Sequence, residues 1–120
     1  APVVRRILVA DDNPDIANTI AELLELDGHQ VRIAYDGQQA LDSFQSYHPD
    51  IVISDIGMPG LTGHQLARAI RETAAGQAVK LIAMTGWGQA QDKADALAAG
   101  FDHHLTKPAD MQTLYELVAS

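Results

Sequence analysis

The chain has 120 residues, of which 47% are hydrophobic and 20% are charged, so residues 1–120 fit one compact domain that needs no disulfide or structural metal. Sixteen acidic residues against eight basic ones give a formal net charge of -8. Such a surface repels nucleic acid phosphates, and we expect no direct nucleic acid binding.

Short apolar runs alternate with longer amphipathic stretches about five times along the chain, which predicts repeated βα units. Several of these runs are nearly continuous in apolar residues, as in strands of a parallel sheet that is covered on both faces. The predicted strands are RILVA near residues 5–10, followed by residues 30–34, 50–54, 80–84 and 103–106.

Capping residues mark the ends of the first three predicted helices. Asn13 is the predicted N-cap of the first helix, with Pro14 at its first position, and Gly28 ends it. Asp36 and Thr62 are the predicted N-caps of the second and third helices. Each of these helices lies between two predicted strands, as a βα unit requires.

Apolar residues predict the last two helices. The stretch 89–99 is rich in alanine and charge, and Ala94, Leu97 and Ala98 form its predicted apolar stripe. The final helix runs almost to the chain end and carries four apolar residues, Met111, Leu114, Leu117 and Val118.

The predicted fold class is α/β, a flavodoxin-like doubly wound five-stranded parallel sheet of (βα)5 type in a single domain. Right-handed crossovers between parallel strands place helices on both faces of such a sheet. Ligand sites in these folds lie just beyond the carboxyl ends of the strands. The candidate functional residues are therefore those that follow each strand.

The sequence shows no signal for membrane insertion or export. The apolar runs ILVA and LIAM are too short to span a bilayer, and APVVRRILVADD lacks the apolar region and cleavage site of a signal peptide. The chain has no cysteine, which agrees with a reducing compartment. We expect a cytoplasmic protein that does not bind membranes.

Charged and hydroxyl residues follow four of the five predicted strands. Asp11 and Asp12 follow the first strand, Asp55 the third, Thr85 the fourth and Lys107 the fifth. Carboxylates that meet at one rim of the sheet repel one another unless a cation lies between them, and hard oxygen ligands suit Mg²⁺. The sequence therefore predicts a Mg²⁺ site in which one or two carboxylates bind the ion directly.

A carboxylate beside Mg²⁺, with a lysine and a hydroxyl nearby, is what phosphoryl transfer to an aspartate requires. The carboxylate attacks in line, while the metal and the ammonium neutralise charge on the transferred group. Asp11 and Asp12 alone would fit solvated loop charges or helix caps equally well. Joined with Asp55 and Lys107, they indicate phosphoryl transfer.

The motifs LVADDN, SDIGMPGLTG, AMTG and LTKP occur in this order and spacing, and through them the whole chain resembles the receiver domains of two-component response regulators. The resemblance implies that Asp55 is the phosphoacceptor. It also implies that Mg²⁺ is the cofactor, with Asp12, Asp55 and the backbone carbonyl of Gly57 as ligands. Asp11 would then hold a metal-bound water.

The same resemblance implies roles for the residues after the last two strands. Thr85 would hydrogen-bond the phosphoryl group on Asp55, and Lys107 would pair with a phosphoryl oxygen. Receivers also suggest a cis peptide between Lys107 and Pro108, where an X-Pro bond keeps the penalty at roughly 0.5 to 1 kcal/mol.

His104 departs from the family pattern, because receivers usually have Tyr or Phe three residues before the lysine. That ring turns inward when the threonine moves toward the phosphoryl group. One interpretation is that His104 takes part in the switch with Thr85 and makes it depend on pH, since imidazole titrates near neutral pH. The other is that His104 is a partly exposed edge-strand residue with no switching role.

Two further positions bear on the lifetime of the phosphorylated state. Gly57 has no side chain to position a hydrolytic water, and Trp87 is large enough to shade the site. Together they predict slow dephosphorylation. The alternative is that Trp87 only packs over the start of the fourth helix.

The expected function is that of a receiver rather than of an enzyme: a phosphorelay module that takes a phosphoryl group from a sensor histidine kinase or a histidine phosphotransfer protein. It would signal through its fourth helix, fifth strand and fifth helix to an output domain or downstream protein. The segment TGWGQAQDKADALAAGFDHHLTKP looks most like receivers of hybrid sensor histidine kinases. The alternatives are a hydrolase resembling haloacid-dehalogenase-like phosphatases, or a pseudo-receiver that binds partners without phosphorylation.

Overall fold

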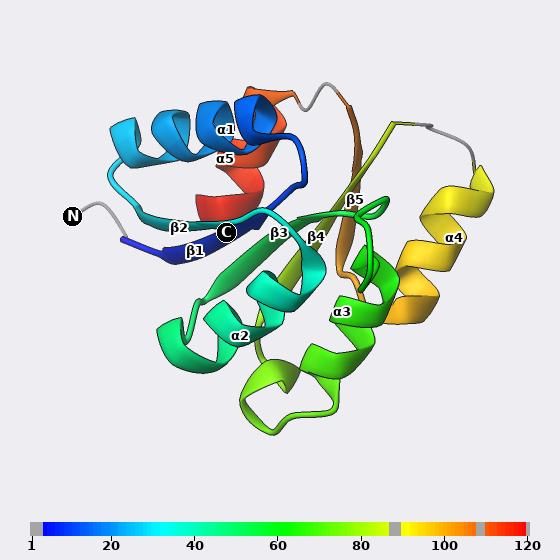
Figure 1. The fold of residues 1–120 in the computed structure, drawn as a ribbon. Coiled ribbons are helices and arrows are strands. Elements are labelled where there is room, and N and C mark those ends of the chain that lie inside the picture. Colours follow the sequence, from blue (N-terminus) through cyan, green and yellow to red (C-terminus); the bar gives the residue numbers. More distant parts are fainter. Residues whose placement is uncertain (1–3, 87–89, 108–109, 120) are drawn as a thin grey trace.

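The computed structural model of the protein describes residues 4–86, 90–107 and 110–119. Its five strands are all parallel and lie in the order β2-β1-β3-β4-β5, with helices on both faces of the sheet (Figure 1). The strands are β1 (Arg6–Ala10), β2 (Gln30–Ala34), β3 (Ile51–Asp55), β4 (Lys80–Thr85) and β5 (His103–Thr106). The helices are α1 (Pro14–Leu26), α2 (Gly37–Tyr47), α3 (Gly63–Arg71), the 3₁₀ helix η1 (Ala75–Gln77), α4 (Ala90–Ala99) and α5 (Met111–Ala119).

Each strand residue faces the opposite side of the sheet from its neighbour, and this alternation divides the core in two. Ile7 and Val9 of β1 pack with α1 and α5, whereas Leu8 and Ala10 pack with α2, α3 and α4. All five residues of the central strand β3 are buried, since helices cover it on both faces. The predicted doubly wound fold is confirmed.

The predicted caps hold the first three helices. The Asn13 side chain accepts hydrogen bonds from two backbone N–H groups at the start of α1, and Asp36 accepts one at the start of α2. Thr62 and Gln65 form a reciprocal capping box at α3. Just after α1, Gly28 has a φ of 97°, a conformation that glycine adopts at little cost.

The apolar face of α4 differs from the predicted one. Ala94, Leu97 and Ala98 are exposed, while Ala96 and Ala99 are buried against α3 and the sheet. An alanine-rich helix has little contrast between its faces, so the choice between two overlapping stripes depends on tertiary packing. The prediction for this helix face was wrong.

The ends of β3 and β4 also differ by one residue from the prediction. Asp55 and Thr85 are the last residues of their strands rather than the first residues beyond them. Asp55 pairs with Met84, and the N–H of Ile56 still donates to the Met84 carbonyl at 3.2 Å. The sheet therefore holds the Asp55 backbone in place.

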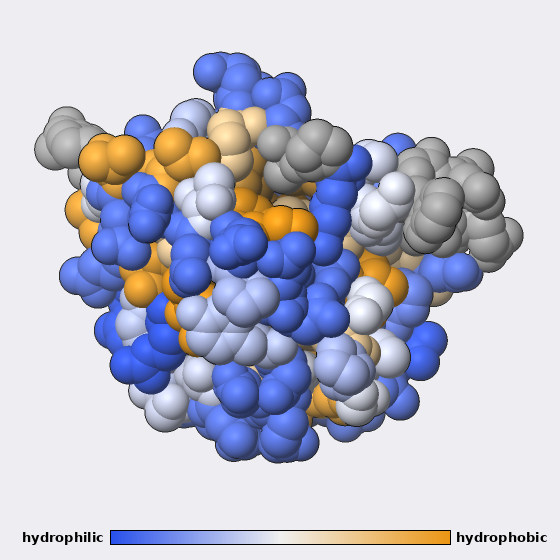
Figure 2. Space-filling model, turned by 45° about the horizontal axis from the view of Figure 1, so that its top comes forward, coloured by the Kyte–Doolittle hydropathy of each residue, from blue (hydrophilic) through white to orange (hydrophobic). Residues whose placement is uncertain are grey.

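The molecular surface fits a domain with its own core. On the face in Figure 2, hydrophilic residues predominate, and apolar residues form smaller patches between them. Among the described residues, no helix is long and apolar enough to cross a membrane. Trp87 and Pro108, and with them the predicted shading and cis peptide, lie outside the described residues.

Candidate functional site

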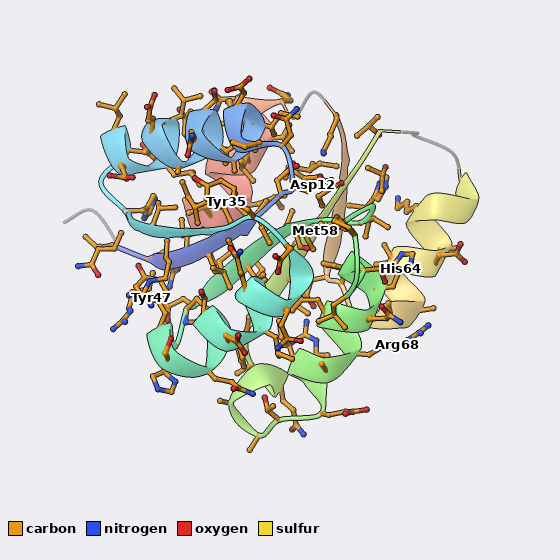
Figure 3. All side chains as sticks on the ribbon, in the orientation of Figure 1. Asp12, Tyr35, Tyr47, Met58, His64 and Arg68 are labelled. Atoms are coloured by element: carbon orange, nitrogen blue, oxygen red, sulfur yellow. The ribbon has the colours of Figure 1, made fainter. Side chains whose placement is uncertain are left out.

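Three carboxylates meet at the carboxyl ends of β1 and β3. Ala10 pairs with Ser54 in the sheet, so Asp11 and Asp55 follow at the same level on adjacent strands. One oxygen from each of Asp11, Asp12 and Asp55 lies within 4.8 Å of the other two. Asp11 and Asp55 are buried and Asp12 is exposed, and Figure 3 shows Asp12 at this rim.

Lys107 joins the cluster from the end of β5. Its ammonium lies 2.9 Å from Asp11 Oδ2 and 3.2 Å from Asp55 Oδ1. Its backbone N–H donates to the Thr85 carbonyl at 2.6 Å, which fixes where the side chain begins. Burial alone would lower the pKa of Lys107, but hydrogen bonds to Asp11 and Asp55 raise it above the ordinary value, so the ammonium stays charged.

Backbone N–H groups orient the two buried carboxylates. The N–H of Asn13 donates to Asp11 Oδ1 at 2.9 Å, and the N–H of Gly57 lies 3.4 Å from Asp55 Oδ1. The backbone of the predicted cap Asn13 thus also orients Asp11 at the site, a role that the sequence analysis did not predict. The signal was its place two residues after Asp11, the spacing at which an Asx turn forms.

The charges fit a divalent cation. Three carboxylates and one ammonium leave a formal charge of -2 in the cluster. Partial loss of hydration and the neighbouring Asp55 and Asp11 raise the pKa of Asp12, although its side chain is exposed. Clustered hard oxygen atoms with uncompensated negative charge suit Mg²⁺. Asp11, Asp12 and Asp55 are thus the residues that could hold it.

Thr85, at the end of β4, lies beside His104 of the neighbouring strand β5. Thr85 is buried and His104 is partly exposed, and the Thr85 Oγ1 atom lies 2.9 Å from His104 Nε2, a hydrogen bond. His104 thus has the exposure expected of an edge-strand residue. It also has a direct contact with Thr85.

An apolar hollow of about 310 Å³ opens next to Lys107. Its walls come from α1 and α5 and from Met84 of β4, and its lining includes Ile16, Ile20 and Met111. The acidic cluster is therefore bordered by apolar surface on the side of α1 and α5.

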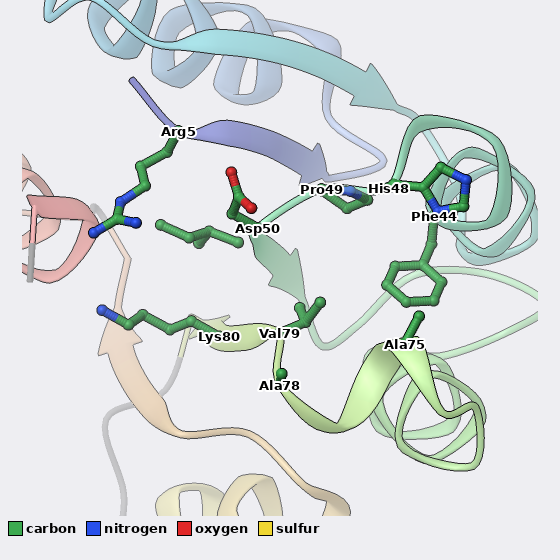
Figure 4. Close-up of a pocket in the computed structure, with 10 residues that line it drawn as sticks. Arg5, Phe44, His48, Pro49, Asp50, Ala75, Ala78, Val79 and Lys80 are labelled. Carbon is green, nitrogen blue, oxygen red and sulfur yellow. The ribbon is translucent and has the colours of Figure 1, made fainter. Parts of the chain in front are cut away.

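A larger hollow of about 450 Å³ lies at the opposite end of the sheet from the carboxylates, where β1, β3 and β4 begin (Figure 4). Arg5 and Lys80 extend from this end of the sheet toward α5. Arg5 Nε donates to the Val118 carbonyl at 3.3 Å, and Lys80 Nζ donates to the Leu117 carbonyl at 2.6 Å. Cations at the last carbonyls of a helix stabilise its C-terminus, so these two residues serve the fold.

The fold and the site define a doubly wound α/β domain with an acidic, lysine-containing pocket at its carboxyl rim. The sequence model of the response regulator receiver domain matches residues 7–119. The chain belongs to this family and is a receiver domain of two-component systems.

Individual relatives agree with this assignment. Protein PilH of Pseudomonas aeruginosa is 36% identical over 94% of this chain and 93% of its own. The chemotaxis response regulator CheY4 of Vibrio cholerae has the same fold, with a TM-score of 0.90 and 28% identity over 97% of both chains. The signal receiver domain of a signal transduction histidine kinase from Syntrophus aciditrophicus also has this fold. Its TM-score is 0.86, with 28% identity over 95% of this chain and 86% of that one. The chain spans less than half the length of other curated relatives, which include response regulators.

Proposed function

We propose that this receiver domain takes a phosphoryl group from a phosphohistidine of a partner onto Asp55, with Mg²⁺ as cofactor. The observation that carries the proposal is the position of the Lys107 ammonium, within 3.2 Å of carboxylate oxygens of both Asp11 and Asp55. A lysine without a functional role would extend into solvent rather than into an acidic cluster with buried carboxylates. A phosphoryl acceptor site, by contrast, requires a cation at this position.

Asp55 is the nucleophile. One of its carboxylate oxygens forms a bond to phosphorus as the bond from phosphorus to the histidine nitrogen breaks, and the histidine ring leaves with the electron pair. Lys107 stabilises negative charge on the transferred group, at the position where it now pairs with Asp55. When bound, Mg²⁺ supplies further charge neutralisation. Asp12, Asp55 and the Gly57 carbonyl would hold the ion, and Asp11 would orient a water bound to it.

On phosphorylation, a phosphoryl group of about -1.5 to -2 charges replaces the single negative charge of the Asp55 carboxylate, and Thr85, at the end of the neighbouring strand β4, is the candidate to respond. We infer that Thr85 hydrogen-bonds the phosphoryl group and that His104 follows it, so that the surface of α4, β5 and α5 changes for an output domain or downstream protein. The donor would be a sensor histidine kinase or a histidine phosphotransfer protein. Likeness to a histidine kinase receiver supports a place within a hybrid kinase.

The alternatives fit the site less well. Phosphatases that resemble haloacid dehalogenases carry the nucleophile after the first strand in an Asp-x-Asp pattern, whereas here Asp11 and Asp12 are adjacent and the proposed nucleophile Asp55 is the last residue of the third strand. A pseudo-receiver would not need the lysine and all three carboxylates. Family membership favours a signalling module over a turnover enzyme.

The decisive experiment is incubation with acetyl phosphate and Mg²⁺, followed by intact mass measurement. The wild-type chain should gain the mass of one phosphoryl group, while Asp55→Asn should gain none. Omission of Mg²⁺ should lower the phosphorylated fraction at a fixed time. An unmodified wild type, or a variant that is phosphorylated to the same extent, would contradict the assignment of Asp55.

A further inference from the structure

The hydrogen bond between Thr85 and His104 connects the acidic rim with the edge strand of the sheet. Parallel pairing of β4 and β5 sets Ala83 opposite His104, and the Thr85 hydroxyl extends from the end of β4 to the imidazole. Thr85 is 7% exposed, whereas His104 is partly exposed on β5. A change at the rim can therefore reach the surface through a single hydrogen bond.

The direction of this bond depends on the proton of the ring. A threonine hydroxyl has one hydrogen to donate, and its oxygen can also accept. If His104 Nε2 is bare, it accepts the only hydrogen of Thr85. If Nε2 carries a hydrogen, it donates to Thr85 Oγ1, and the hydroxyl hydrogen is available to another acceptor.

We propose that phosphorylation of Asp55 reverses this hydrogen bond, so that His104 holds a hydrogen on Nε2 and donates to Thr85 while Thr85 donates to a phosphoryl oxygen. The inference rests on the proposed phosphorylation of Asp55. His104 is then a positioning residue for Thr85, because it touches the hydroxyl and not the phosphoryl group. The phosphorylation state is read out by the ring of His104.

The protons balance within the neutral ring. Thr85 keeps its hydrogen and turns it from Nε2 toward the phosphoryl oxygen. His104 takes up a hydrogen at Nε2 from water and releases the one on Nδ1 to water. Nδ1 thereby changes from a hydrogen-bond donor to an acceptor, which gives a partner that contacts β5 a chemical difference to recognise.

His29 provides an internal reference for the Nε2–H form. The backbone N–H of Arg5 donates to His29 Nδ1 at 3.0 Å, so Nδ1 is bare, and a neutral ring must carry its hydrogen on Nε2. His29 Nε2 lies 3.4 Å from Asp27 Oδ2, where that hydrogen has an acceptor. The two rings can thus be compared in one spectrum.

The test is a long-range ¹H–¹⁵N correlation spectrum of ¹⁵N-histidine-labelled protein, recorded with Mg²⁺ and with or without acetyl phosphate. The pH is set above the neutral range, where an ordinary imidazole is uncharged. Intact mass reports the phosphorylated fraction of each sample. On phosphorylation, the His104 Nε2 signal should shift toward the Nε2–H position that His29 shows, and the His29 signals should stay in place.

Two substitutions at Thr85 provide the matched controls, compared at equal phosphorylated fraction. Thr85→Ser keeps a hydroxyl and should keep the response of His104, whereas Thr85→Val has none and should lose it. A phosphorylated wild type whose His104 signals do not move would overturn the inference, and with it the proposed response of His104, but would leave the proposed phosphorylation of Asp55 standing. An equal response in Thr85→Val would overturn it too, because the ring would then sense the charge without the hydroxyl. If Asp55 takes up no phosphate, both proposals fail.

Discussion

Asp12 is the exposed member of the carboxylate cluster, while Asp11 and Asp55 are held by Lys107 and by backbone N–H groups. This difference in exposure among the three carboxylates has a chemical use. Buried, oriented carboxylates keep a fixed geometry, and an exposed one can take up an ion from solvent. Partial loss of hydration, together with repulsion from Asp55 and Asp11, raises the pKa of Asp12, and a bound cation would relieve that repulsion.

Mg²⁺ binding should depend on pH through Asp12. Protons compete with Mg²⁺ for a carboxylate, and partial loss of hydration, Asp55 and Asp11 raise the pKa of Asp12 above the ordinary value of an aspartate. Affinity should therefore fall as the pH is lowered, from a higher pH than an ordinary aspartate would give. Asp12→Asn should bind Mg²⁺ about tenfold more weakly or worse, with a flatter pH profile. Calorimetric titration over a pH series tests this, and parallel profiles for both proteins would contradict it.

At the scale of elements, the site depends on the close approach of the first residue of α3 to the end of β3. The Gly63 N–H donates to the Ile56 carbonyl at 3.0 Å. A Cβ atom at Gly63 would lie 2.4 Å from the Asp55 carbonyl oxygen and 2.7 Å from Ile56 Cα. Both are backbone atoms that cannot turn away, so only glycine permits this approach.

Gly63→Ala should destabilise the protein by about 1–3 kcal/mol, because helix and strand must separate to make room for the methyl group. The matched control is Gly57→Ala, where an added Cβ would meet no atom within 4 Å. Its change in unfolding free energy should stay within about 0.5 kcal/mol. Urea unfolding followed by circular dichroism measures both, and equal losses would contradict the contact argument.

At the scale of the whole molecule, Arg71 joins segments that are far apart in the sequence. Its guanidinium donates to the carbonyls of Gly100 at 2.9 Å, Gly76 at 2.8 Å and Val79 at 2.7 Å. It also forms an ion pair with Asp102 at 2.8 Å. One side chain at the end of α3 thus connects η1 with the entries to β4 and β5, at the end of the sheet opposite the acidic site.

Arg71→Met should lower the unfolding free energy by about 1–3 kcal/mol, because several carbonyl groups lose a charged donor. Arg68→Met, one turn earlier in α3 at an exposed position, is the control and should change it by less than about 0.5 kcal/mol. The unfolding midpoint in urea compares them. Similar midpoints for the two variants would show that the Arg71 network contributes little.

Local patterns in the sequence were sufficient for the fold class and for predicting that the carboxylates and the lysine of the candidate site lie together. Alternation of apolar runs and caps such as Asn13 and Thr62 depends on neighbours within a few residues, so it can be read along the chain. The order of elements then places Asp11, Asp55 and Lys107 at one rim, because all strands of a parallel sheet end on the same side.

Tertiary structure alone decided the contacts that depend on register and side-chain reach. Three examples are the buried face of α4, the hydrogen bonds of Arg71 and the hydrogen bond between Thr85 and His104. In each of them the contacting residues are separated along the chain by distances that do not predict the contact. The physical reason is that an alanine-rich helix or an arginine side chain fits several environments equally well. The packing of the sheet and its helices determines which of these environments surrounds the side chain, and therefore which atoms come into contact.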